Sequence, residues 1–253
     1  MREVVLLQKI YNDVSLREFE EFLKKLCEGL RVQLMGLNMV ANRWVKIRVS
    51  GDDEKVAVLF LGKELGLAPI SIGNVKQFSI LRGRVMFSQR SPSKVFVDVG
   101  VFSPKPVYAV VSLQRLQGQL VDGKKFALKR IVELFGLVDG FPLEVQVVRD
   151  GINEFEAKLT EKQIKLYSNW IGSRVDRLIV LGALGEKIEK AVRKAGLKRY
   201  VIGIESLSIL DHVVVCKLGT DAIGLIPKLR RQLFRVSLVR FSPRRVLELV
   251  GGL

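Results

Sequence analysis

The stretch KVFVDVGVFSPKPVYAVVSL, residues 94–113, contains two short apolar runs on either side of a turn, and the first run carries an aspartate at its centre. Successive side chains of a strand point to opposite faces, so the alternation places the three valines of VFVDVG on one face. Phe96 and Asp98 fall on the other face. Residues 94–113 therefore predict two neighbouring strands whose valine face fills the interior of a small barrel.

Three further strand candidates lie close to this stretch: ILRGRVMF (80–87), FPLEVQVV (141–148) and EFEAKLT (154–160). The segment KKFALKRIVELFG (124–136) predicts a helix between the third and fourth strands. Five short strands with a helix in this place have the order of an OB-type barrel.

Both flanks of the barrel mix helices and strands. Residues 1–76 have the pattern strand, helix, strands, helix, and residues 161–253 return to a similar alternation after the barrel at 77–160. In the last part we expect a helix capped by Thr220 or Asp221 that reaches about Gln232, followed by a strand at FRVSLVRF (234–241) and a short helix. The sequence thus predicts an α+β protein with a central five-stranded OB-type β-barrel flanked by two α+β modules.

The barrel segments RGRVMF, KVFVDVG, VYAVVSL and EVQVVRDGINEFEAKLT resemble the RNA-binding OB domain of the ribosomal-protein-S-one type, over about a third of the chain. The resemblance implies an RNA-binding barrel in which Phe96 takes the place of one base-stacking aromatic. Three positions depart from the family pattern. Ser93 stands where a second aromatic is frequent, Val110 where a histidine is frequent, and Glu154 with Phe155 near a frequent Gly-Arg.

Two interpretations of Phe96 remain open. A base stacked on its ring would cover an outward phenylalanine, and such stacking contributes roughly 1–3 kcal/mol per base. Alternatively, a neighbouring module or the helix at 124–136 covers the ring.

The chain carries a large excess of positive charge, with 42 Lys and Arg against 26 Asp and Glu, a net charge of +16 and an isoelectric point near 10.0. Residues 161–253 hold 18 basic and 8 acidic side chains and therefore most of the excess. Such a surplus repels itself and is typical of proteins that bind a polyanion.

We expect the RNA-binding residues to lie in three groups. The barrel contributes Phe96 with Arg82, Arg84 and Arg90. The helix predicted after residue 185 and the turn behind it contribute Lys187, Lys190, Arg193, Lys194, Lys198 and Arg199. The final stretch contributes Lys228, Arg230, Arg231, Arg235, Arg240, Arg244 and Arg245, and its arginines suit bidentate contact with phosphate.

Two glycine motifs have a structural and a functional interpretation. Gly182-Ala183-Leu184-Gly185 fits the G-x-x-G turn with which KH domains grip a nucleic-acid backbone, but apolar residues between the glycines favour a plain strand-to-helix turn. Gly219 and the amides after it could hold one phosphate, whereas Thr220 and Asp221 are most simply helix caps.

The whole chain also resembles an uncharacterised archaeal family of about this length, through EKQIKLYSNWIGSRVDRLIVLGA and VVCKLGTDAIGLIPKL. This resemblance implies an archaeal cytoplasmic protein with the barrel in its middle, and it implies no activity.

The sequence offers little material for catalysis. Two separated cysteines and one histidine predict no disulfide, zinc site or serine-type triad, and we expect no cofactor. The start of the chain lacks the features of a signal peptide, and no apolar run approaches the length of a membrane span, so we expect a cytoplasmic protein that does not enter a membrane.

Three functions are compatible with these features. The first is a non-catalytic RNA-binding protein that engages ribosomal or other structured RNA. The second is a metal-dependent RNA-processing nuclease using some of Asp98, Asp150, Asp176, Glu205, Asp211 and Asp221. The third is a protein-interaction factor of the transcription or translation machinery, whose partners would be ribosome or polymerase proteins and in which Phe96 is buried against a polypeptide.

Overall fold

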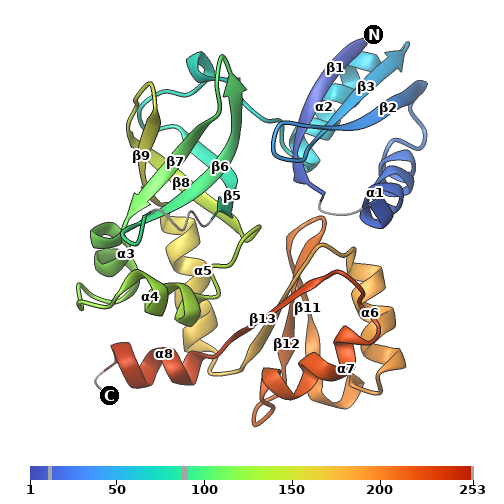
Figure 1. The fold of residues 1–253 in the computed structure, drawn as a ribbon. Coiled ribbons are helices and arrows are strands. Elements are labelled where there is room, and N and C mark those ends of the chain that lie inside the picture. The colour runs from blue at the N-terminus through green and yellow to red at the C-terminus, as the bar shows by residue number, and fades with distance from the viewer. Residues whose placement is uncertain (11–12, 87–90, 252–253) are drawn as a thin grey trace. The chain divides into compact units, whose positions relative to one another are not determined.

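A computed structural model of the chain describes residues 1–10, 13–86 and 91–251. It is an α+β structure with a central five-stranded barrel (Figure 1). The fold class predicted from the sequence is therefore confirmed. Within the described residues, no helix has the length and apolar character needed to cross a membrane.

The chain divides into two compact units. The first consists of Met1–Asn74 together with Gly100–Pro106, and the second of Val75–Val99 together with Val107–Leu253. The strand at residues 94–103 therefore begins in the second unit and ends in the first.

The first unit is a three-stranded antiparallel sheet with two helices, in the strand order β1-β3-β2. Its elements are β1 (Arg2–Lys9), α1 (Asp13–Leu26), β2 (Val32–Val40), β3 (Trp44–Gly51), α2 (Glu54–Glu64) and the short β4 (Ile70–Ser71). Val5, Trp44 and Ala68 are buried together, and Phe102 packs against them. The sequence pattern predicted this order of elements.

Gly100 is required where the chain enters this unit. Its φ of +76° lies in the left-handed region, and a Cβ at this position would approach the Cβ of Ala68 to 2.7 Å. Only glycine fits such a close approach without strain. The glycine after VFVDV thus allows the strand to continue beside β4, where Ile70 pairs in parallel with Val101.

The second unit contains the barrel. Its strands are β5 (Ile80–Met86), β6 (Lys94–Ser103), β7 (Val107–Ser112), β8 (Pro142–Arg149) and β9 (Glu154–Leu159). They close in the order β5-β6-β7-β9-β8, with β7 and β9 parallel. Val95, Val97 and Val99 are fully buried, as their alternation predicts. All five strands lie within a few residues of the expected segments.

Two helices, rather than one, connect β7 to β8. They are α3 (Leu113–Leu120) and α4 (Leu128–Phe135). Ser112 caps α3 by accepting a hydrogen bond from the Arg115 amide, and Leu116 and Leu120 are buried. Gly118 weakens the helical pattern of α3, so the sequence does not predict this helix.

After the helix α5 (Glu161–Gly172), which Thr160 caps as expected, a four-stranded sheet forms in the order β11-β12-β10-β13. Its elements are β10 (Arg177–Leu181), α6 (Gly185–Lys194), β11 (Val201–Ser208), β12 (Asp211–Cys216), α7 (Ile226–Arg230), β13 (Ser237–Phe241) and α8 (Pro243–Val250). We call residues 177–250 the C-terminal module. The helices α6 and α7 pack on one face of its sheet through a cluster that includes Ile188, Val192 and Leu229.

The opposite face of this sheet shares an aromatic cluster with the barrel helices. Phe241 of β13 lies 5.1 Å from the ring of Trp170 and 6.5 Å from that of Phe135, measured between centroids. Tyr167 stacks with Phe141 in the same cluster. Tyr167 and Trp170 are thus core residues that join the barrel to the C-terminal module.

Two expected boundaries in this module are wrong. The helix expected to reach Gln232 is a 3-10 turn (Ala222–Leu225) followed by α7, which ends at Arg230, and the strand expected from Phe234 begins at Ser237. Residues 231–236 therefore form a loop. This loop carries part of the candidate site.

Candidate nucleic-acid interface

The helix α7 is oriented by apolar residues at every fourth position. Leu225, Leu229 and Leu233 are at most 4% exposed and belong to the core of the C-terminal module. Asp221 begins this segment by accepting a hydrogen bond from the Ile223 amide at 2.8 Å. Because one side of the helix is fixed in the core, the basic side chains between the leucines are directed to solvent.

Four of the predicted cations form an exposed group on α7 and the loop after it. Lys228, Arg230, Arg231 and Arg235 are all exposed, and none of them carries an ion pair with a residue that the structure describes. The guanidinium of Arg235 lies 5.3 Å from the ring centroid of Phe234. We call these four cations together with Phe234 the α7 patch.

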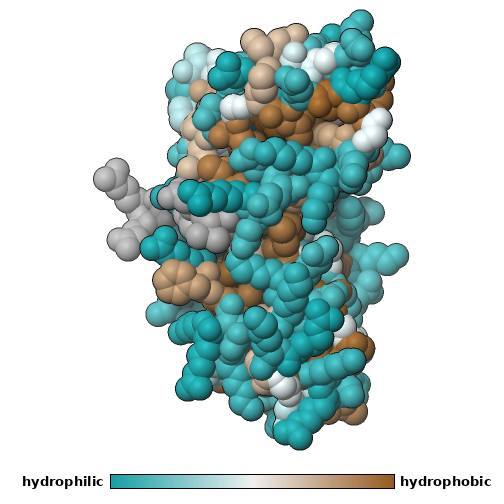
Figure 2. Space-filling view, turned by 90° about the vertical axis from the view of Figure 1, so that its right-hand side faces the viewer, coloured by the Kyte–Doolittle hydropathy of each residue, from teal (hydrophilic) through white to brown (hydrophobic). Residues whose placement is uncertain are grey.

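The helix α6 presents a second basic surface. Ile188, Ala191 and Val192 are buried, so the other side of the helix faces solvent. Its exposed cations and those just beyond it are Lys190, Arg193, Lys194, Lys198 and Arg199, whereas Lys187 is half-buried. Figure 2 views the side of the C-terminal module that carries α6, where hydrophilic residues dominate the surface.

The remaining predicted cations of the final stretch differ in their exposure and ion pairs. Arg240 is only 20% exposed and pairs with Asp221 at 3.6 Å. Arg244 pairs with Glu248 at 2.7 Å on the surface of α8, and Arg245 is half-buried. Of the predicted cluster of seven, the four cations of the α7 patch are exposed without an ion pair to a described residue, whereas Arg244 is exposed and paired.

The RNA-binding residues predicted in the barrel differ in their exposure to solvent. Phe96 is half-buried and Arg82 is exposed, with its Nε 3.3 Å from Glu144. Arg90 lies outside the described residues. Val110 and Phe155, two of the departures from the S-one pattern, are buried and are therefore not available to a base.

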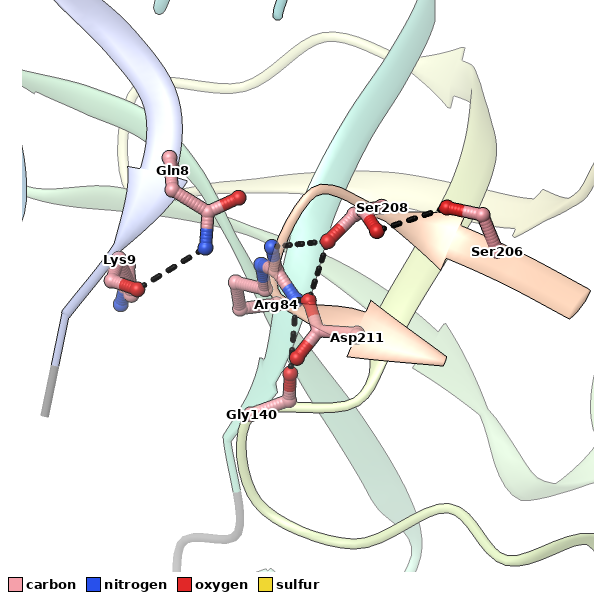
Figure 3. Close-up of polar contacts among 7 residues, drawn as sticks. All are labelled: Gln8, Lys9, Arg84, Gly140, Ser206, Ser208 and Asp211. Atoms are coloured by element: carbon pink, nitrogen blue, oxygen red, sulfur yellow. Dashed lines mark hydrogen bonds and ion pairs between the residues drawn. The ribbon is translucent and has the colours of Figure 1, made fainter. Parts of the chain in front are cut away.

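Arg84 is a correction to the predicted interface, because its side chain is only 4% exposed. It forms an ion pair with Asp211 at the start of β12, and its guanidinium donates to Ser208 Oγ and to the Gly140 carbonyl, both at 3.2 Å (Figure 3). Arg84 also lies opposite Asp98 in the β5–β6 ladder, and Asp98 is buried as well. The contacts of Arg84 with Asp211, Ser208 and Gly140 join the barrel to the β11–β12 hairpin.

The G-x-x-G motif is a structural turn between β10 and α6. The amides of Gly182 and Ala183 both donate to the Leu210 carbonyl at 2.8 Å, and Ala183 is fully buried. These amides are therefore already used within the protein and do not face a phosphate. The motif thus forms a strand-to-helix turn, which is the interpretation that its apolar residues favour.

Cys216 and His212, the cysteine and the histidine of the second unit, are both buried. Burial raises the pKa of the Cys216 thiol to about 12, and burial lowers the pKa of His212 below its usual value. Both groups are therefore uncharged at neutral pH. Cys27 in the first unit is also a buried free thiol.

The six acids considered for a nuclease have separate structural surroundings. Asp211 pairs with Arg84, Asp221 caps the turn before α7, and Asp176 accepts a hydrogen bond from the Ala222 amide at 3.3 Å. Asp98 is buried, whereas Asp150 and Glu205 are exposed. Among the described residues, no three His, Cys, Asp or Glu side chains come close enough together to hold a metal ion.

Phe234 is the residue of this site that the sequence analysis missed. Its side chain is 78% exposed, whereas the sequence pattern placed it at the start of a strand. The available signal was its position in RRQLFR, where an aromatic stands between arginines.

Comparison with protein-family models gives three consecutive matches. The DUF2110 N-terminal domain matches residues 3–69, the DUF2110 central domain matches residues 80–171, and the DUF2110 C-terminal domain matches residues 175–234. The last match ends at Phe234 and includes both α6 and α7. A search of curated proteins found no match.

Proposed function

Starting from the premise that the chain belongs to the DUF2110 family, we propose that it is a non-catalytic RNA-binding protein that engages ribosomal or other structured RNA. Its C-terminal module supplies the phosphate contacts. The observation that carries the proposal is the α7 patch, where four exposed cations have no ion pair with a described residue.

The composition of the α7 patch favours a phosphate ligand. Like charges close together on a short helix and loop are unfavourable unless a counter-charge neutralises them. Three of the four cations are arginines, whose planar guanidinium groups contact phosphate oxygens through two hydrogen bonds. The exposed cations of α6 extend the same positive character over the C-terminal module.

The barrel has a smaller part in this proposal than its resemblance implies. Arg84 is excluded by its burial, which leaves Arg82 and the half-buried Phe96. The barrel adds contacts at the margin of the RNA site and supports the C-terminal module through the Arg84–Asp211 ion pair.

We place this activity in the cytoplasm. Cys27 and Cys216 are free and buried, and unpaired thiols are typical of a reducing compartment. In this proposal, ribosome or polymerase proteins are additional partners in that compartment.

Titration of the purified protein with a structured RNA at two salt concentrations tests the proposal. If four cations each neutralise one phosphate, raising the salt from about 50 to about 200 mM weakens binding roughly a hundredfold. The triple variant Arg230→Glu, Arg231→Glu and Arg235→Glu is expected to abolish binding while the circular dichroism spectrum stays unchanged.

The matched control is Lys25→Glu, Lys55→Glu and Lys63→Glu, which makes the same change in net charge with exposed residues of the first unit. This control is expected to keep most of the affinity. Equal losses for both triple variants, or an unchanged affinity for the arginine triple, would contradict the proposed site. Magnesium-dependent cleavage of the RNA would favour the nuclease alternative, and undetectable RNA binding would favour the protein-interaction alternative.

A further inference from the structure

Phe234 is held out of the core by its own loop. The preceding residue, Leu233, is 1% exposed, and its amide donates to the Leu229 carbonyl at 2.8 Å. Phe234 itself is 78% exposed. The ring is therefore available to a ligand, and covering it would remove apolar surface from water.

The next residue fixes a cation against this ring. Arg235 adopts a φ of +57°, in the left-handed region that a long side chain rarely occupies. Its guanidinium carbon lies 5.3 Å from the centroid of Phe234, within the range of a cation–π contact. A guanidinium covers at most one face of a ring, which leaves the other face for a second planar group.

The surroundings of the ring select the kind of planar group. Lys228, Arg230 and Arg231 are exposed on the same short helix and loop and have no ion pair with a described residue. A nucleotide combines a flat aromatic base with a negatively charged phosphate, and these match a ring that lies beside one guanidinium on a segment with three further exposed cations.

We propose that Phe234 is a stacking platform for an unpaired RNA base, so that the α7 patch prefers single-stranded or looped RNA to a continuous duplex. The bases of an RNA duplex are stacked on one another and are not accessible to a phenyl ring, whereas the bases of loops and bulges can be splayed out. This inference rests on the proposed function and names the class of RNA that it selects.

Binding of the full-length protein to three nucleic acids tests the inference. The probes are a single-stranded RNA carrying 2-aminopurine, the blunt duplex formed by the same strand, and single-stranded DNA of the same sequence. The variant Phe234→Ala is expected to lose about five- to hundredfold in affinity for both single strands, because base–aromatic stacking contributes that range. Its affinity for the duplex and the salt dependence of binding stay unchanged, since no phosphate contact is removed. Stacking of 2-aminopurine on an aromatic ring quenches its fluorescence. Phe234→Trp is expected to retain both the affinity and this quenching, because tryptophan also offers a flat ring.

Phe78→Ala is the matched control, because Phe78 is another highly exposed phenylalanine, at 67%, that lies before the first barrel strand. It is expected to bind all three probes like the wild type. If the wild type binds none of the probes, the proposed function fails and the inference fails with it.

If the wild type binds RNA and Phe234→Ala binds every probe equally well, the stacking inference alone is overturned. An equal loss of affinity for single strand and duplex also overturns it. A third contrary result concerns vesicles of phosphatidylcholine and phosphatidylglycerol. If the wild type binds these vesicles, and Phe234→Ala loses this binding but binds RNA as the wild type does, the ring serves a lipid surface and the stacking inference is overturned.

Discussion

Arg82 and Arg84 stand two positions apart on the same strand and have different surroundings. The side chain of Arg82 is 62% exposed and pairs with Glu144, whereas that of Arg84 is 4% exposed and pairs with Asp211. Exposed ion pairs contribute about 0–1 kcal/mol, because water screens the charges. A buried pair contributes little net stability, but the loss of one partner leaves the other charge buried and uncompensated.

Replacing Arg84 by methionine is therefore expected to lower the free energy of unfolding by about 3–5 kcal/mol. The same change at Arg82 lowers it by about 1 kcal/mol at most. Urea denaturation of both variants measures the difference. A small effect at Arg84, equal to that at Arg82, would show that the buried contact with Asp211 is not formed in solution.

At the scale of single elements, Gly136 at the end of α4 lets this helix pack closely against the sheet of the C-terminal module. Gly136 follows α4 with a φ of +64°, and its amide donates to the Val132 carbonyl. A Cβ at this position would come within 2.6 Å of Ile179 Cδ1 on β10. This glycine is needed both for the left-handed turn and for the close approach of helix and sheet.

Gly136→Ala is expected to lower the free energy of unfolding by about 2 kcal/mol or more, because strain in the turn adds to overpacking against Ile179. Gly118→Ala is the control. Gly118 lies within α3 with nothing close to its Cβ position, so alanine there is expected to stabilise the protein by about 0.5–1 kcal/mol. Thermal or urea unfolding distinguishes the two, and a neutral effect at Gly136 would contradict the packing described for α4.

The barrel elements were predictable because their signals are local. Alternating valines fix the register of β6, and the five strands are short runs with turn residues between them. The end of α7 and the start of β13 were not predictable in this way. Leu229 and Leu233 enter a core formed by strands that are distant in the sequence, and this contact determines whether residues 231–236 extend a helix or a strand. The residues next to 231–236 in the sequence give no signal for that contact.

At the scale of the whole second unit, the barrel and the C-terminal module share one core. Phe241 is fully buried among Phe135, Tyr167 and Trp170. A cluster built from both parts makes it unfavourable for either part to unfold alone.

Phe241→Ala is therefore expected to lower the free energy of unfolding by about 3–5 kcal/mol and to reduce hydrogen-exchange protection in both parts. The amides of β8 and of β12 report on the barrel and on the C-terminal module, respectively. Phe234→Ala serves as the control and leaves protection nearly unchanged, because its side chain is exposed. Loss of protection in β12 alone would mean that the two parts unfold separately.

The candidate site was only partly predictable, because some of its contacts join residues that lie far apart in the sequence. The excess of cations in residues 161–253 is a property of composition, and the sequence identified it together with the arginines of α7. It could not separate Arg84 from those surface cations, because its partner Asp211 is 127 positions away. Nor could it show that Arg240 pairs with Asp221, a contact made by the return of β13 to the turn before α7.

The division of β6 between the two units constrains how the gene can be cut. A fragment that starts at residue 75 would encode every strand of the barrel, yet Val101 and Phe102 would lose Ala68 and Ile70, the residues they meet in the first unit. A fragment that stops at residue 74 would lack the segment 100–106 that completes its own fold. Residues 75–99 of the second unit thus interrupt the first unit along the polypeptide, so the first unit cannot be inherited, exchanged or expressed intact as one uninterrupted piece.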